Sequence, residues 1–75
     1  MTTEEALNLF KTKSCTVLAI GLGVCKKNGI GIGKFTTGRV TEYNTVYLNE
    51  IDYYVAIWNI LEVEIDGKIV PIVDR

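Results

Sequence analysis

The first apolar residues of the chain recur at the spacing of a helix. The apolar stripe of this segment consists of Ala6, Leu7, Leu9 and Phe10. Thr2 and Glu5 stand three residues apart, which is the spacing of a capping box at a helix N-terminus. Lysines follow the stripe, and cations suit the C-terminal end of a helix. The pattern predicts a short helix over about residues 3 to 12.

From residue 15 onward the pattern changes to short apolar alternations rich in valine, isoleucine, threonine and tyrosine, which are enriched in strands. Two strong turn signals, Asn28-Gly29 and Asp66-Gly67, interrupt these alternations. No repeat, linker or low-complexity tract divides the chain. We therefore expect one mainly β domain over residues 1–75, with strands between about residues 15 and 73.

The first turn signal predicts a hairpin whose two faces differ in side-chain size. With a three-residue loop over residues 27–29, Val24 faces Ile32 and Leu22 faces Lys34. The large face, which we expect to line the core, contains Leu18, Ile20, Leu22, Val24, Ile30 and Ile32. The small face contains Ala19, Gly21, Gly23, Gly31 and Gly33. Such a face favours sharp bending and leaves room for the N-terminal helix or for a neighbouring subunit.

The glycines and lysines of "KKNGIGIGKFTTG" (residues 26–38) raise the question of phosphate binding. A P-loop requires Gly-x-x-x-x-Gly-Lys-Ser/Thr between a strand and a helix. Here Asn28 takes the place of the first glycine, and Phe35 takes that of the hydroxyl residue. The segment that follows has the pattern of a strand. The glycines are therefore expected to bend the chain, and no nucleotide site is predicted.

The segment after Gly38 predicts two short strands about a turn near residues 42 to 45, with Val46 and Leu48 on one face. The apolar phase shifts at Trp58-Asn59, which predicts a single 3₁₀ turn between two further strands. We expect Trp58 itself to lie in the core.

The second turn signal predicts a type I′ hairpin with a two-residue loop at Asp66-Gly67. This loop pairs Val63 with Val70, and Leu61 with Ile72. Pro71 lacks a backbone N–H, so it favours an edge strand at the end of the domain.

A short N-terminal helix, about five curved strands and a 3₁₀ turn before the last hairpin together resemble the SH3-like and Sm-like small barrels. The stretch "YNTVYLN" is similar to the third strand of Sm-like proteins, with Asn44 at the place of their asparagine, and "IDGKIVPIV" is similar to their closing segment. Val40 stands near the place of the Sm-like aspartate, and Asp66 where those proteins often carry a basic RNA-contacting residue. The resemblance implies a small, strongly bent, five-stranded antiparallel barrel, and it implies RNA binding as an alternative function.

The composition points to association. The chain has 75 residues, of which 48% are hydrophobic, and its mean hydropathy is +0.22. A chain of this length buries only about 60% of its unfolded surface, so some apolar surface is expected to need a partner. Residues 1–39 carry six basic and two acidic residues (+4), whereas residues 40–75 carry two basic and seven acidic ones (−5). The two readings of this asymmetry are interleaved surface charge and opposite poles that attract copies head to tail.

Catalytic and metal chemistry find little support in the residues. Histidine is absent, and the two cysteines lie about 33 Å apart if the run between them is extended, which disfavours an internal disulfide. Cys25 adjoins two lysines, but a cysteine in an apolar strand is typically packing material. Glu62 and Glu64 project from one side of a strand, as solvated residues do. We predict no enzyme activity, no cofactor and no metal.

Free thiols fit a reducing compartment, and a cytoplasmic location is the expectation. The apolar run "CTVLAIGLGVC" is too short to span a bilayer, and the acidic Glu4 and Glu5 before it do not suit a signal peptide. No membrane association is predicted.

Candidate interaction residues come from two groups, aromatic and basic. They are Tyr43, Tyr47, Tyr53, Tyr54, Lys26, Lys27, Lys34 and Arg39. Tyrosines on the surface suit a protein interface, and together with basic residues they suit base stacking and phosphate contact. An acidic pI of about 5.3 disfavours nucleic acid.

The function predicted from these observations is a non-catalytic interaction or assembly module that forms homo-oligomers. We expect it to bury surplus apolar and tyrosine surface between copies, through pairing of its last strand with a neighbour's exposed strand. Two alternatives remain: an Sm-like barrel that binds single-stranded RNA, and a small regulatory protein that docks on a larger enzyme. The expected partner is a second copy of the chain, with another protein next and RNA less favoured.

Overall fold

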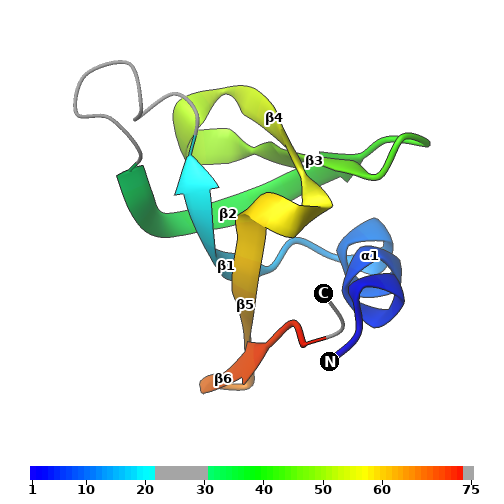
Figure 1. The fold of residues 1–75 in the computed structure, drawn as a ribbon, viewed down its shortest axis with the longest axis vertical. Coiled ribbons are helices and arrows are strands. Elements are labelled where there is room, and N and C mark those ends of the chain that lie inside the picture. Colours follow the sequence, from blue (N-terminus) through cyan, green and yellow to red (C-terminus); the bar gives the residue numbers. More distant parts are fainter. Residues whose placement is uncertain (22–30, 74–75) are drawn as a thin grey trace.

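The computed structural model describes residues 1–21 and 31–73 (Figure 1). One helix, α1 (Thr3–Thr12), precedes the strands β1 (Thr16–Gly21), β2 (Gly31–Val40), β3 (Thr45–Leu48), β4 (Tyr53–Ala56), β5 (Ile60–Ile65) and β6 (Lys68–Pro71). Two 3₁₀ turns flank β4, namely η1 (Asn49–Ile51) and η2 (Ile57–Asn59). The mainly β character of the chain is confirmed.

The helix begins and ends where its sequence predicted. Thr2 Oγ1 accepts a hydrogen bond from the backbone N–H of Glu5 at 3.1 Å, and Glu5 Oε1 accepts one from the N–H of Thr2 at 2.8 Å. This reciprocal pair is the predicted capping box, which satisfies backbone donors that the first turn leaves open. The buried residues of α1 are Ala6, Leu7 and Phe10, so the helix adds one apolar side to the core.

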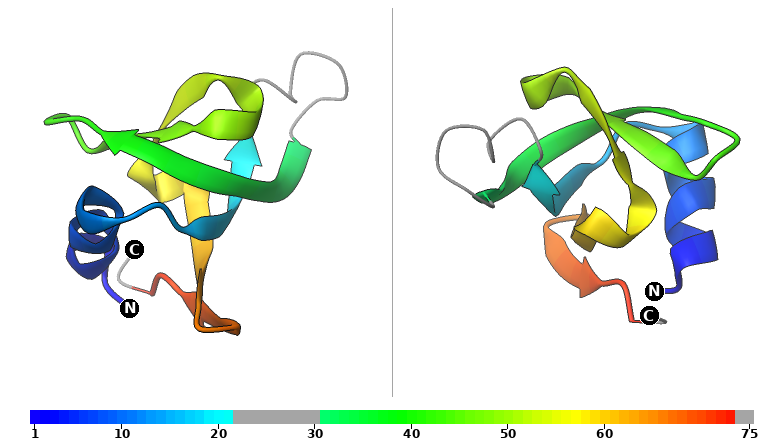
Figure 2. Two further views of the ribbon diagram at one scale, coloured as in Figure 1. Left: turned by 180° about the vertical axis from the view of Figure 1, so that it is seen from behind. Right: turned by 45° about the horizontal axis from the view of Figure 1, so that its top comes forward.

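Within the described residues, six antiparallel strands form one sheet in the order β4-β3-β2-β1-β5-β6. The long β2 runs across the molecule and pairs with β1 along one part and with β3 along another (Figure 2). The register shifts between Thr37 and Val40, and again in β1 between Leu18 and Ala19. Such irregularities increase local twist and bend. The prediction of five strands was wrong, and closure into a barrel is not confirmed, because β4 and β6 are the two ends of the order.

The predicted register of the first hairpin was also wrong. Ile32 pairs with Ile20, and Lys34 pairs with Leu18, rather than with Val24 and Leu22. The pairing is shifted by four residues along β1, and within the described residues it runs from Thr16 and Thr36 to Gly21 and Gly31. The proposed loop at 27–29, together with Leu22, Gly23, Val24 and Ile30, lies outside the described residues.

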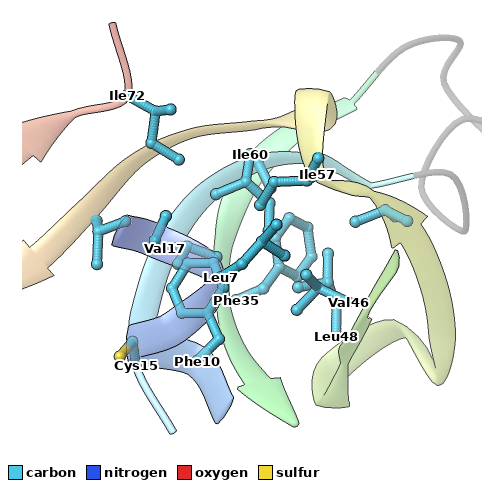
Figure 3. Packing of buried hydrophobic residues seen from close by; sticks show 14 residues of the cluster. Leu7, Phe10, Cys15, Val17, Phe35, Val46, Leu48, Ile57, Ile60 and Ile72 are labelled. Carbon is cyan, nitrogen blue, oxygen red and sulfur yellow. The ribbon is translucent and has the colours of Figure 1, made fainter. Parts of the chain in front are cut away.

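The face of β1 and β2 that points to the core is the small one, contrary to the prediction. Ala19 is 0% exposed, whereas Ile32 is 61% exposed. The reason is visible in the packing of Phe35, whose ring lies over Gly33; a Cβ on that glycine would stand 3.3 Å from Phe35 Cζ. Small residues on the concave side make room for bulky ones, and Leu7 and Phe10 of α1 share this core with Phe35 (Figure 3). The alternative in which the small face admits the helix is therefore correct.

Thr37 of β2 is a buried polar residue of this core. Its hydrogen bonds join β2 to the segment between α1 and β1. Its Oγ1 accepts a hydrogen bond from the N–H of Cys15 at 2.8 Å, and its N–H donates to the carbonyl of Cys15 at 2.9 Å. Ser14 Oγ donates to the Thr37 carbonyl at 2.5 Å. These bonds satisfy polar groups that burial would otherwise leave unpaired.

The turns of the second half match the sequence closely. Val63 pairs with Val70, and Ile72 N–H donates to the Leu61 carbonyl at 3.0 Å. Asp66 and Gly67 both have positive φ, 51° and 79°, as a type I′ turn requires. The predicted 3₁₀ turn at Trp58-Asn59 is η2, and β6 is the predicted edge strand.

The assignment of the core face can be tested with one substitution made at two sites. Val17→Thr places a hydroxyl at a position 1% exposed, so it should lower the free energy of unfolding by about 1–3 kcal/mol. Ile32→Thr keeps a β-branched residue on the surface and should change it by no more than about 0.5 kcal/mol. Urea denaturation of both variants measures the difference, and a larger loss in Ile32→Thr would restore the opposite face as the core.

Candidate functional site

Two of the predicted tyrosines form a pair on the β3–β4 hairpin. Tyr47 lies opposite Tyr54 in the ladder, with ring centroids 5.0 Å apart and an interplanar angle of 61°. Edge-to-face contact of this kind stabilises cross-strand pairs. Tyr47 also covers Gly38 of β2, where an added Cβ would lie 3.0 Å from Tyr47 Cδ2 and 2.8 Å from Asn49 Oδ1. The pair is thus held against β2 by a close approach that glycine permits.

The hydroxyl of Tyr47 donates a hydrogen bond to Asp52. Asp52 ends η1 with a left-handed φ of 51°, a conformation that aspartate tolerates better than most residues. The bond holds the proton on the phenol and raises the pKa of Tyr47, with desolvation and the charge of Asp52 adding to the effect. Tyr47 is therefore a neutral donor and a poor general base.

Glu50, the middle residue of η1, fastens this turn to β2. Its carboxylate accepts hydrogen bonds from the Thr36 N–H at 2.6 Å and from Thr36 Oγ1 at 2.7 Å. These bonds stabilise the charged form and hold the pKa of Glu50 below its usual range. The role of this carboxylate is to anchor the turn.

The other two tyrosines do not join the pair. Tyr53 lies opposite Leu48, one position from the pair along β4. Tyr43 is 80% exposed in the turn between β2 and β3, where its N–H donates to Thr41 Oγ1. Asn44, the residue of the Sm-like comparison, lies in the same turn with a φ of 61° and not within the strand.

The basic residues and the tyrosine pair do not form one platform in the described residues. Lys34 lies on β2 opposite Leu18 of β1, whereas Tyr47 packs over Gly38, four residues farther along β2. Arg39 is exposed near the end of β2. Lys26 and Lys27 lie outside the described residues.

The feature that the sequence interpretation missed is an apolar surface on the convex side of the sheet. We call it the outer face and define it by Leu18, Ile20, Ile32, Lys34, Glu62 and Ile69. Ile69 is 51% exposed. A hollow of about 180 Å³ opens here, lined by Thr16, Val17, Leu18, Lys34, Glu62, Glu64 and Ile69. The shared alternation of Val17, Ala19 and Phe35 was the signal that could have revealed it, since a phenylalanine on the small side indicates the core.

Trp58 is a second correction. It is 69% exposed on η2, while Ile57 before it and Ile60 after it are buried. In a 3₁₀ turn residues three apart lie on one side, so Ile57 and Ile60 take the inner side and Trp58 the outer one.

The described residues contain no group of three or more histidine, cysteine, aspartate or glutamate residues arranged to hold a metal. Cys15 is buried and is not in a disulfide, and desolvation raises the pKa of its thiol, which disfavours the nucleophilic thiolate. Cys25 lies outside the described residues. Glu62 and Glu64 share the convex side of β5.

In the part of the chain that the structure describes, no helix has the length and apolar character needed to cross a bilayer.

Backbone groups at the two sheet edges also bear on association. The N–H of Ile72 bonds to Leu61 of β5, and backbone groups alternate in direction along an antiparallel strand. The backbone groups of Ile69 and Pro71 in β6 therefore point away from β5, toward the edge of the sheet. Pro71 has no N–H, its carbonyl accepts a bond from Met1 N at 2.7 Å, and Val73 N–H donates to the Met1 carbonyl. The N–H of Ile57 donates to the Asn44 carbonyl. By the same alternation, the backbone groups of Tyr54 and Ala56 in β4 point away from β3.

Comparison of the chain with protein-family models, with curated proteins and with solved structures gave no match.

The anchor at Glu50 makes stability depend on pH. Since the folded state lowers the pKa of Glu50, the stabilisation is present above the unfolded-state pKa and is lost as pH falls below about 5. Glu50→Gln should flatten the fall of the urea midpoint on acidification. Glu42→Gln, at an exposed turn position, is the control and should keep the wild-type slope. An unchanged slope in Glu50→Gln would show that the carboxylate does not hold the turn.

The bond between Tyr47 and Asp52 is testable by titration of the tyrosines. Asp52→Asn should lower the pKa of Tyr47, because it removes a charged acceptor, and difference absorbance of phenolate formation measures the shift. Asp66→Asn is a matched control, since Asp66 has the same left-handed φ of 51°. Equal titration curves for the two variants would contradict the assignment.

Proposed function

We propose that this chain is a non-catalytic interaction module that associates with copies of itself in the cytoplasm. The observation that carries the proposal is the outer face. Leu18, Ile20, Ile32 and Ile69 lie on the convex side of the sheet, while α1 fills the concave side. Apolar side chains grouped on one side of a small domain favour burial against a partner.

The mode of association that the structure favours is contact through a face. Pairing through β6, as expected from the sequence, would use few groups, because Pro71 lacks a donor and Met1 already bonds to Pro71 and Val73. Proline and a covering segment protect an edge strand from pairing. The edge of β4 is the more accessible of the two for strand addition.

RNA binding is the weaker alternative. Stacking on Tyr47 and Tyr54 would bring phosphates toward Asp52, which bonds to Tyr47, and acidic groups oppose phosphate contact. Docking on a larger enzyme would use the same outer face, and the state of the free protein separates it from self-association.

Light scattering after size-exclusion chromatography tests self-association directly. At high protein concentration the mass should reach at least twice the 8.4 kDa of one chain, and it should fall on dilution. Raising the salt concentration screens charges but should not remove the apolar contribution to self-association. The mass of a single chain at every concentration would refute the proposal and direct attention to a different protein partner.

A further inference from the structure

The outer face carries charge of opposite sign on the two sides of β1. Leu18 has Lys34 of β2 as its neighbour on one side and Glu62 of β5 on the other. One row along, Thr16 lies between Thr36 of β2 and Glu64 of β5. With strands about 4.8 Å apart, Lys34 and Glu62 stand roughly 10 Å apart at the Cα level, separated by an apolar side chain. At the level of Leu18 the face is thus positive on the β2 side and negative on the β5 side, with an apolar side chain between. At the level of Thr16, the β2 side carries the Glu50 carboxylate, which bonds to Thr36.

The row formed by Lys34, Leu18 and Glu62 is complementary to itself. A rotation of 180° about an axis that lies in the interface and runs along β1 reverses the lateral order of the strands. The positive side of one copy then faces the negative side of the other, and the centre faces the centre. A two-fold interface uses the same patch on both copies, as this charge pattern permits.

We propose that a second copy of this chain packs on the outer face about such a two-fold axis, with Leu18 against the partner's Leu18 and Lys34 against the partner's Glu62. This inference rests on the proposed self-association and specifies its geometry. Sheets that pack face to face keep their strands within about 30° of each other, which a small tilt of the axis from β1 provides.

The hollow of the outer face gives the lysine a place to bind. It is lined by Leu18 and Ile69, by Glu62 and Glu64, and on the β2 side by the same copy's own Lys34. The aliphatic stem of the partner's Lys34 lies along the apolar residues, and its ammonium reaches the carboxylates. Each copy contributes one such contact, so the dimer contains two.

The size of the face sets the expected affinity. Four strands at about 4.8 Å and six residues at about 3.3 Å give roughly 400 Å² on each copy. Interfaces below about 1,200 Å² in total belong to weak, transient complexes. The dimer is therefore concentration-dependent, and measurements must extend to several hundred micromolar protein.

Charge reversal at two sites tests the geometry by sedimentation equilibrium. K34E and E62K should each weaken dimerisation about tenfold or more, because each homodimer then contains two like-charge contacts. An equimolar mixture of K34E and E62K should dimerise about as tightly as the wild type, since both contacts again join opposite charges. Native mass spectrometry identifies the heterodimer. K11E and E42K, at exposed positions on α1 and in the β2–β3 turn, are the controls and should dimerise like the wild type.

A second pair of variants tests the position of the two-fold axis. This test remains valid if K34E or E62K fails to fold. L18E and L18K should each lose dimerisation, because like charges meet at the axis, and their mixture should recover it. Circular dichroism confirms that each variant keeps the wild-type fold.

The outcomes separate this inference from the proposed function. Monomeric wild-type protein at all concentrations overturns both. Dimeric wild-type protein whose variants and mixtures all dimerise equally overturns the outer face and leaves self-association through another surface, such as the β4 edge. Weakened single variants without recovery in either mixture overturn the two-fold arrangement.

Discussion

The fit between Phe35 and the small residues beside it is the packing constraint that sets which side of the sheet becomes the core. Ala19 and Gly33 leave little side-chain volume on the concave side of a bent sheet, and the Phe35 ring occupies the space above Gly33. Leu7 and Phe10 of α1 complete the same core. Interiors are packed to nearly crystalline density, so bulky residues on both layers would not fit. The two register irregularities of the sheet supply the curvature that brings the helix close.

That constraint determines the surface as well as the core. Side chains alternate along a strand, so turning Val17 and Ala19 inward turns Leu18 and Ile20 outward. The convex side therefore carries apolar residues for which the small interior has no room. Leu18 lies between Lys34 of β2 and Glu62 of β5. These charges of opposite sign distinguish one side of the apolar surface from the other. The association that we propose follows from this inward and outward division of β1.

The polar bonds of the hairpin region have a different role. Glu50 bonds to Thr36 of β2, and Tyr47 of β3 bonds to Asp52, so η1 and the residue after it are fastened to two neighbouring strands. The aromatic residues that the sequence offered as an interface are partly used to hold this turn in place. The tyrosine pair and Lys34 consequently belong to separate regions, on β3–β4 and beside β1.

Elements whose causes are local could be predicted from the amino-acid sequence. The capping box at Thr2 and Glu5, the left-handed turn at Asp66-Gly67 and the phase shift at Trp58 each depend on residues within a few positions, and each is found as predicted. The register of β1 with β2, the choice of core face and the exposure of Trp58 depended on distant groups. A strand with apolar residues on both faces can be buried from either side, so only the packing of Phe35 and α1 decided which side became the interior. The outer face, as a candidate site, was for the same reason invisible until the tertiary structure had set that choice.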